Sequence, residues 1–171
     1  MSSAKKIVLS GVFTALLIGV QVVLSAISGI EIVTVLLLTF VYMYGTKQGL
    51  LVANAFSLLR CFLFGFMPNV LVLYLVYYNV FVIVFGFFGK IFKGEYSVKK
   101  HLVVILVAIV MTALFTMLDN VITPFIYCFT KESTIAYFIA SLYTLIPHLV
   151  CTFATVLVIF PMLLKVLKNK K

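Results

Sequence analysis

Charged residues are scarce in this sequence, and acidic residues are the scarcest. Of 171 residues, 10% are charged, with only 4 Asp or Glu against 13 Lys or Arg. An ordinary soluble domain is about 25% charged and about 45–50% apolar, whereas this chain is 65% hydrophobic and has a mean hydropathy of +1.30. This composition excludes most classes of soluble enzyme and predicts an integral membrane protein.

Cysteine is also rare, and its placement suggests no structural role. Cys61, Cys128 and Cys151 are odd in number, far apart and set inside apolar runs. A disulfide framework or a zinc site needs more cysteines or a closer spacing. We therefore expect neither.

The common catalytic and nucleotide-binding motifs are missing as well. The sequence has no GxxxxGK(S/T) phosphate-binding loop, no GxSxG and no HExxH, so it cannot drive transport with nucleotide by itself. With two His and a single Asp, it lacks the residues of an intramembrane metalloprotease or of a two-aspartate protease. We expect no enzymatic activity, no cofactor and no metal.

Six long apolar runs are present instead. A membrane helix needs about 20 apolar residues to cross about 30 Å of hydrocarbon, so 171 residues allow roughly six crossings and no soluble domain. The second run has only about 15 residues, or about 22 Å as a helix. The prediction is all-α: one integral membrane bundle, residues 1–171, of six transmembrane helices at about Ile7–Ile27, Ile30–Tyr44, Gln48–Phe66, Val70–Phe88, His101–Tyr127 and Thr134–Leu164.

The basic residues between these runs predict the orientation. With six crossings, the N-terminus, Lys47, the hydrophilic loop Lys90–Lys100 and the C-terminus share one side and hold eleven Lys, whereas the other side holds only Lys131. Positively charged loops stay inside the cell, so both termini are predicted to be cytoplasmic. The lysines then contact anionic lipid of the bilayer. No basic face with interleaved aromatics lies outside the membrane, so we expect no nucleic-acid partner.

Two ionisable residues fall inside the runs, and each has two interpretations. An ionisable side chain inside a bilayer faces the bundle interior and usually marks function. Arg60 and Asp119 lie at similar depth in the outer half of the predicted membrane. Either they pair with each other and fix the packing of two helices, or one or both face a polar pocket that opens outward.

Further polar residues gather at the same level. Glu31 begins the second run at the outer face, and Asn120 adjoins Asp119. His148 lies near the membrane centre, where a lone His more often bonds two helices together than binds a ligand. Several polar side chains gathered within an apolar wall are typical of a ligand pocket. The candidate substrate-binding residues are Arg60, Asn69, Tyr74, Asn79, Asp119, Asn120, Tyr143 and His148.

Small residues form a stripe on the first run. Gly11, Ala15 and Gly19 recur every four residues, which lets another helix approach closely on that face. The stripe either packs within this protein or docks another membrane protein.

Four segments characterise the layout together with the order of the runs: KKIVLSGVFTALLIGV (Lys5–Val20), GIEIVTVLLLTFVYMYGTKQGLL (Gly29–Leu51), FLFGF (Phe62–Phe66) and IFPMLLKVLKNKK (Ile159–Lys171). In these features the chain resembles the substrate-binding S component of energy-coupling factor (ECF) vitamin transporters, most of all the cobalamin-type and uncharacterised group.

The resemblance implies a multi-pass protein of the bacterial plasma membrane that binds a vitamin or precursor from outside. Its pocket would be formed largely by the fourth to sixth helices and the outer loops, and a cobalamin-like ligand is preferred on this ground alone. The partners implied are a transmembrane coupling subunit, contacted through Gly11, Ala15 and Gly19, and two cytoplasmic ATPases. Glycine replaces the alanine of the family pattern at two of these three positions.

A second hypothesis is a non-catalytic structural membrane scaffold of the cell-envelope machinery. A scaffold predicts that Arg60 and Asp119 are sealed together and that no pocket surrounds them. The small number of charged residues argues against a heavily anionic ligand, because one Arg cannot neutralise several phosphates in a site of low dielectric.

Overall fold

The computed structural model describes residues 3–26, 30–92 and 97–168. These residues fold into six α-helices, as the sequence predicts. The helices are α1 (Ser3–Leu24), α2 (Val33–Tyr44), α3 (Thr46–Phe64), α4 (Pro68–Ile91), α5 (Val98–Ile126) and α6 (Lys131–Lys168). The all-α class is confirmed.

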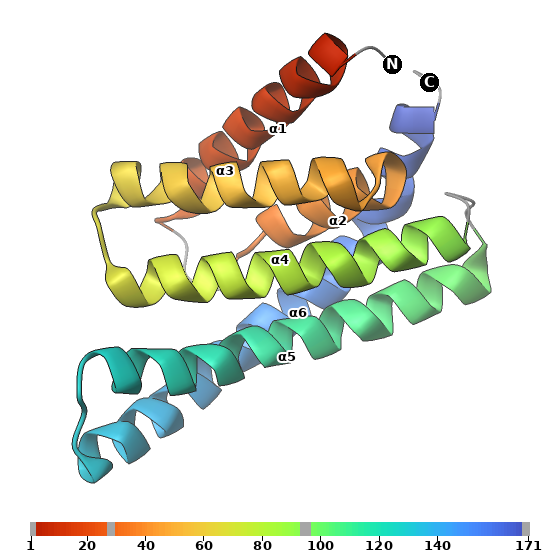
Figure 1. Ribbon diagram of the computed structural model, residues 1–171. Helices are drawn as coiled ribbons and strands as arrows, with labels where there is room; N and C mark the ends of the chain where they lie inside the picture. Colours follow the sequence, from red (N-terminus) through yellow and green to blue (C-terminus); the bar gives the residue numbers. More distant parts are fainter. Residues whose placement is uncertain (1–2, 27–29, 93–96, 169–171) are drawn as a thin grey trace.

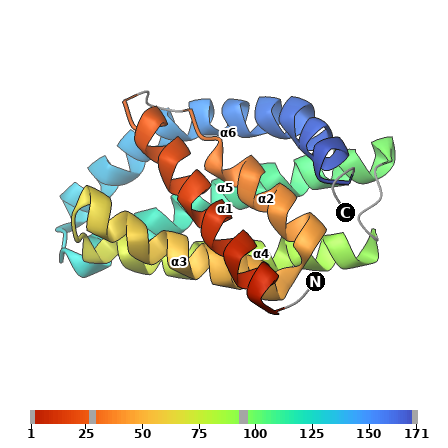
Figure 2. The ribbon, with the colours of Figure 1, turned by 90° about the horizontal axis from the view of Figure 1, so that it is seen from above.

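Helices α3, α4 and α5 run back and forth in roughly one direction, and α1 lies obliquely to them (Figures 1 and 2). The start of α1, the α2–α3 connection and the end of α6 lie at one end of the molecule. The α3–α4 and α5–α6 connections lie at the other. We call the first the lysine-rich end, because it carries Lys5, Lys6, Lys47, Lys90, Lys99, Lys100 and Lys165, and the second the lysine-poor end, which carries Lys131.

Four of the six helices are long and apolar enough to cross a membrane: α1, α4, α5 and α6. The 38 residues of α6 correspond to about 57 Å, and Figure 2 shows this helix as an arc across the bundle. Two prolines, Pro147 and Pro161, lie inside it, and each removes a backbone hydrogen bond and favours bending. The 12 residues of α2 correspond to only about 18 Å.

Glycine and proline set the turns at both ends of α3. Gly45, with φ of +85°, separates α2 from α3 by a single residue, a conformation that disfavours side chains with a Cβ. Gly65, with φ of +91°, ends α3. Pro68 then begins α4, where its missing N–H removes no helical hydrogen bond.

Several helix boundaries differ from the prediction. Ile30–Ile32 precede α2 instead of beginning it, and α3 starts at Thr46 rather than Gln48. Pro68 and Asn69, which fall between the predicted third and fourth runs, belong to the first turn of α4, and Lys131 begins α6. The break between the predicted first and second runs, at Ser28 and Gly29, and the middle of the Lys90–Lys100 loop lie outside the described residues.

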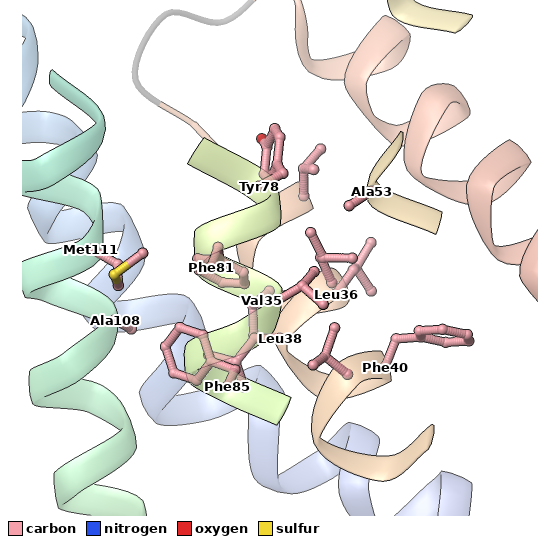
Figure 3. Packing of buried hydrophobic residues seen from close by; sticks show 14 of the residues in the cluster. Val35, Leu36, Leu38, Phe40, Ala53, Tyr78, Phe81, Phe85, Ala108 and Met111 are labelled. Carbon is pink, nitrogen blue, oxygen red and sulfur yellow. The ribbon is translucent and has the colours of Figure 1, made fainter. Parts of the chain in front are cut away.

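The short helix α2 is the centre of the core. Every residue from Val33 to Tyr42 is buried, and α2 packs against α1, α3, α4 and α6. A helix that is apolar on all sides is stable only when it is buried in this way. Figure 3 shows Phe81 and Phe85 of α4 between Val35 and Leu38 of α2 and Ala108 and Met111 of α5.

Helix α1 is the most peripheral. It crosses α3 obliquely (Figure 2), packs against α3 and α2, and buries only Ser10, Thr14 and Leu17. These three residues recur at helical spacing, so α1 presents one narrow face to the bundle and leaves the opposite face open.

Candidate functional site

A partly open cavity of about 310 Å³ lies near the lysine-poor end of the bundle. Its polar lining comes from Gln21 and Ser25 of the α1 end, Glu31 before α2, Arg60 of α3 and His148 of α6. Aromatic walls are formed by Phe64, Tyr74 and Phe115. Polar groups that converge within an apolar wall are the usual composition of a small-molecule site.

Among the residues that the structure describes, Arg60 has no polar partner at this cavity. Its guanidinium carbon is 4.4 Å from the centre of the Tyr74 ring and 5.2 Å from that of Phe64. Such cation–π contacts contribute about 0.5–2 kcal/mol. Arg60 makes no hydrogen bond or ion pair within the described residues, and its Nε is buried and unpartnered. Its N–H donors are therefore left for another group.

Glu31 brings the opposite charge to the cavity. Its Oε1 accepts a hydrogen bond of 3.4 Å from the Tyr78 hydroxyl, and its backbone N–H lies 3.3 Å from the Sγ of Cys151 as donor. These contacts attach the segment before α2 to α4 and α6. Glu31 was predicted to begin the second run at the outer face, but it was not among the candidate substrate-binding residues.

Gln21 completes the polar lining on the α1 side. Its Nε2 donates to the Tyr74 hydroxyl at 3.4 Å, and its buried Oε1 has no hydrogen-bond partner in the described part of the chain. Gln21 was not among the predicted site residues, although it and Thr14 are the two polar side chains of the apolar segment Val12–Leu24. The wall from α1 to α3 also differs from the implied pocket of the fourth to sixth helices, because α5 and α6 supply only Phe115 and His148.

Asp119 does not pair with Arg60; it belongs to a hydrogen-bonded series that we call the polar chain. Tyr137 donates to Asp119 Oδ2 at 2.7 Å, and Thr123 donates to Asp119 Oδ1 at 2.6 Å. Asn69 in turn donates to Thr123 at 3.0 Å and accepts from Tyr127 at 3.1 Å. The polar chain joins α4, α5 and α6, and both carboxylate oxygens of Asp119 are occupied.

The other predicted site residues also lie away from the cavity. Asn79 and Asn54 exchange two amide hydrogen bonds, of 3.1 and 3.2 Å, between α4 and α3. Asn120 donates to Ser141 at 2.8 Å and links α5 to α6. Tyr143 is 78% exposed on the outside of α6. Of the eight candidates, the structure brings Arg60, Tyr74 and His148 to the cavity.

The small-residue stripe of α1 faces outward. Gly11, Ala15 and Gly19 are all exposed, and a Cβ added at either glycine would meet no atom within 4 Å. The buried side of α1 is instead formed by Ser10, Thr14 and Leu17. Within the described residues, the stripe is therefore not used for packing.

No similarity to a characterised protein accompanies these features. The chain matches no family model, no curated protein and no solved structure. In residues 3–26, 30–92 and 97–168, no three His, Cys, Asp or Glu side chains are grouped as metal ligands. The cavity and the exposed small-residue stripe of α1 are therefore the features that bear on the function.

Proposed function

We propose that this chain is the substrate-capture (S) component of an ECF-type importer. It crosses the bilayer six times with both termini in the cytoplasm, binds a vitamin-like micronutrient from outside, and delivers it through a coupling subunit and two ATPases. The observation that carries the proposal is the cavity at the lysine-poor end, which holds a guanidinium with no polar partner among the described residues.

The distribution of lysines supports the orientation. The two ends of the molecule differ strongly in the number of lysines, and the lysine-rich end of a membrane protein stays in the cytoplasm. The cavity then opens toward the outside.

The shortness of α2 is compatible with six crossings. Although about 18 Å is less than the hydrocarbon thickness, all residues from Val33 to Tyr42 are buried among neighbouring helices. A helix covered by protein does not need to match the lipid thickness, because its neighbours make the contact with lipid. The 19 residues of α3, about 28 Å, return the chain to the outer side.

Capture follows from the chemistry of the lining. The aromatic walls remove apolar ligand surface from water, which supplies most of the affinity. Arg60 offers a planar set of N–H donors to a carboxylate or an amide oxygen. Gln21 and Glu31 add hydrogen-bond acceptors to the cavity lining, so that the ligand is oriented as well as bound.

The outward stripe of α1 supports docking to a coupling subunit. Small residues allow two membrane helices to approach closely, and this stripe has no partner within the described part of the chain. The scaffold hypothesis has less support, because it required a sealed pair of Arg60 and Asp119. The carboxylate of Asp119 is bound by Thr123 and Tyr137 instead.

The proposal is tested by thermal unfolding of the detergent-purified protein with a panel of vitamins and precursors. A true ligand stabilises the protein by about 4 kcal/mol at a thousandfold excess over Kd. We expect a single strong hit, lost in Arg60→Ala and kept in Lys47→Ala, which removes one charge from the exposed surface of the same helix. No hit for any compound would contradict a capture function.

Coupling is tested separately with Ala15→Leu. This change enlarges an exposed side chain of the stripe and should leave Tm and ligand binding unchanged while reducing ligand uptake and co-purification with the coupling subunit. Ala140→Leu enlarges an exposed alanine of α6 and should change none of these. Equal uptake by both variants would remove the stripe from the proposal.

A further inference from the structure

The size of the cavity limits the ligand, given the proposed function on which this inference rests. Its volume of about 310 Å³ lies at the lower end of the range of ligand pockets, about 300–1,000 Å³. The partly open cavity can enclose a ligand of the size of an amino acid or a single-ring vitamin. A corrinoid ring system would lie largely outside it, so the smaller ligand fits better than the cobalamin-like ligand that the resemblance favours.

The charges of the cavity limit the ligand further. Arg60 and Glu31 are the two charged side chains of the lining, and they make no ion pair with each other within the described residues. Within the described residues, the Arg60 guanidinium contacts the Tyr74 and Phe64 rings, and the Glu31 carboxylate accepts one hydrogen bond, of 3.4 Å, from Tyr78. Two opposite charges thus stand at one cavity, each with most of its hydrogen-bonding capacity unused.

From these two observations we propose that the ligand is a small zwitterion, with a carboxylate at one end and a protonated or quaternary nitrogen at the other. Its carboxylate pairs with Arg60, whose planar fork matches two carboxylate oxygens. Its cationic nitrogen pairs with Glu31. A ligand with only one charge leaves the other protein charge desolvated and unpaired, which is unfavourable in a site of low dielectric.

The aromatic residues fix the ligand between these two ends. Tyr74 contacts the Arg60 guanidinium with its ring face and accepts a hydrogen bond from Gln21. One side chain therefore positions both the charge of Arg60 and the amide of Gln21. Phe64 and Phe115 line the same cavity and contact the uncharged middle of the ligand. Arg60 is therefore held in place by stacking before the ligand arrives.

The test uses the purified full-length protein and thermal unfolding in detergent. The probes are the twenty protein amino acids, glycine betaine, carnitine and trigonelline as zwitterions, together with a vitamin panel that includes cyanocobalamin. At least one zwitterion should raise Tm by about 5–10 °C at a hundredfold excess over Kd. The amine and the acid that correspond to it, each with one charge removed, should bind at least about tenfold more weakly.

Two variants test the two charges. Arg60→Gln should abolish the preference for the zwitterion over its amine, and Glu31→Gln should abolish the preference for the zwitterion over its acid. Lys47→Gln and Glu132→Gln change the same charges at exposed positions and should preserve both preferences. A purely structural role of Arg60 or Glu31 would lower Tm without changing these preferences, and that result would overturn the assignment.

The outcomes separate this inference from the proposed function. Stabilisation by cyanocobalamin, or by a vitamin with a net charge or no charge, with no response to any zwitterion, overturns the ligand class and leaves substrate capture standing. No response to any zwitterion or vitamin overturns both.

Discussion

Gly89 of α4 lies directly against the backbone of α2, and its replacement by Ala is expected to destabilise the bundle. A Cβ at Gly89 would lie 2.7 Å from the carbonyl oxygen of Tyr42 and 3.0 Å from the Tyr42 Cα. Both atoms belong to the backbone of a buried helix, so no change of side-chain rotamer relieves the contact. The two helices must move apart instead. At Gly11 the same substitution meets no atom within 4 Å.

The magnitude follows from two opposing contributions. Ala is favoured over Gly inside a helix by up to about 1 kcal/mol, and this gain applies at both positions. Overpacking of a core costs about 1–3 kcal/mol, and contact with rigid backbone puts Gly89 in the upper half of that range. The net expectation is a loss of about 1–2 kcal/mol for Gly89→Ala and a gain of up to about 1 kcal/mol for Gly11→Ala.

The assay is thermal unfolding of both variants in the same detergent. For a chain of this length, 1 kcal/mol shifts Tm by about 2–4 °C. Gly89→Ala should therefore unfold about 2–8 °C below the wild type, and Gly11→Ala at the wild-type temperature or up to about 4 °C above it. A Gly89→Ala protein at least as stable as the wild type would refute the close approach of α2 and α4. An equal loss in Gly11→Ala would refute the open outer face of α1.

Two further predictions concern the polar chain and the orientation. Tyr137→Phe removes the hydrogen bond to Asp119 Oδ2 and should lower the unfolding free energy by about 1–3 kcal/mol. Tyr143→Phe, at a residue that is 78% exposed, should have little effect. Equal effects of the two substitutions would contradict the hydrogen bond between Tyr137 and Asp119. Cys128 is exposed at the α5–α6 connection and should react from outside intact cells with a membrane-impermeant maleimide. Cys128→Ser should abolish that labelling, and labelling only after lysis would reverse the proposed orientation.

The order of the helices was predictable where glycine interrupts the apolar runs. Gly45 and Gly65 both adopt positive φ, as turns after apolar runs often require. The exact boundaries were less predictable. Pro68 lies between two predicted runs, yet proline is well suited to the first position of a helix. The following residue, Asn69, is therefore helical and contributes to the polar chain.

The site was predicted only in part, for a physical reason. Intramembrane polar residues face the protein interior, and Asn79, Asn120 and Asp119 do so. The sequence does not say which of several interhelical seams each one enters, because that depends on the rotation and tilt of every helix. Close contacts such as that of Gly89 with Tyr42 set those angles. They became visible only in three dimensions.

Helix α1 presents two different surfaces. Its last turn and the following Ser25 form one wall of the cavity, while its small-residue stripe faces away from the bundle. Because α1 buries only three residues, a shift of α1 on α2 and α3 would change the shape of the cavity. If, as proposed, a partner protein binds the stripe and a ligand binds the cavity, binding at each surface would change the affinity at the other through α1.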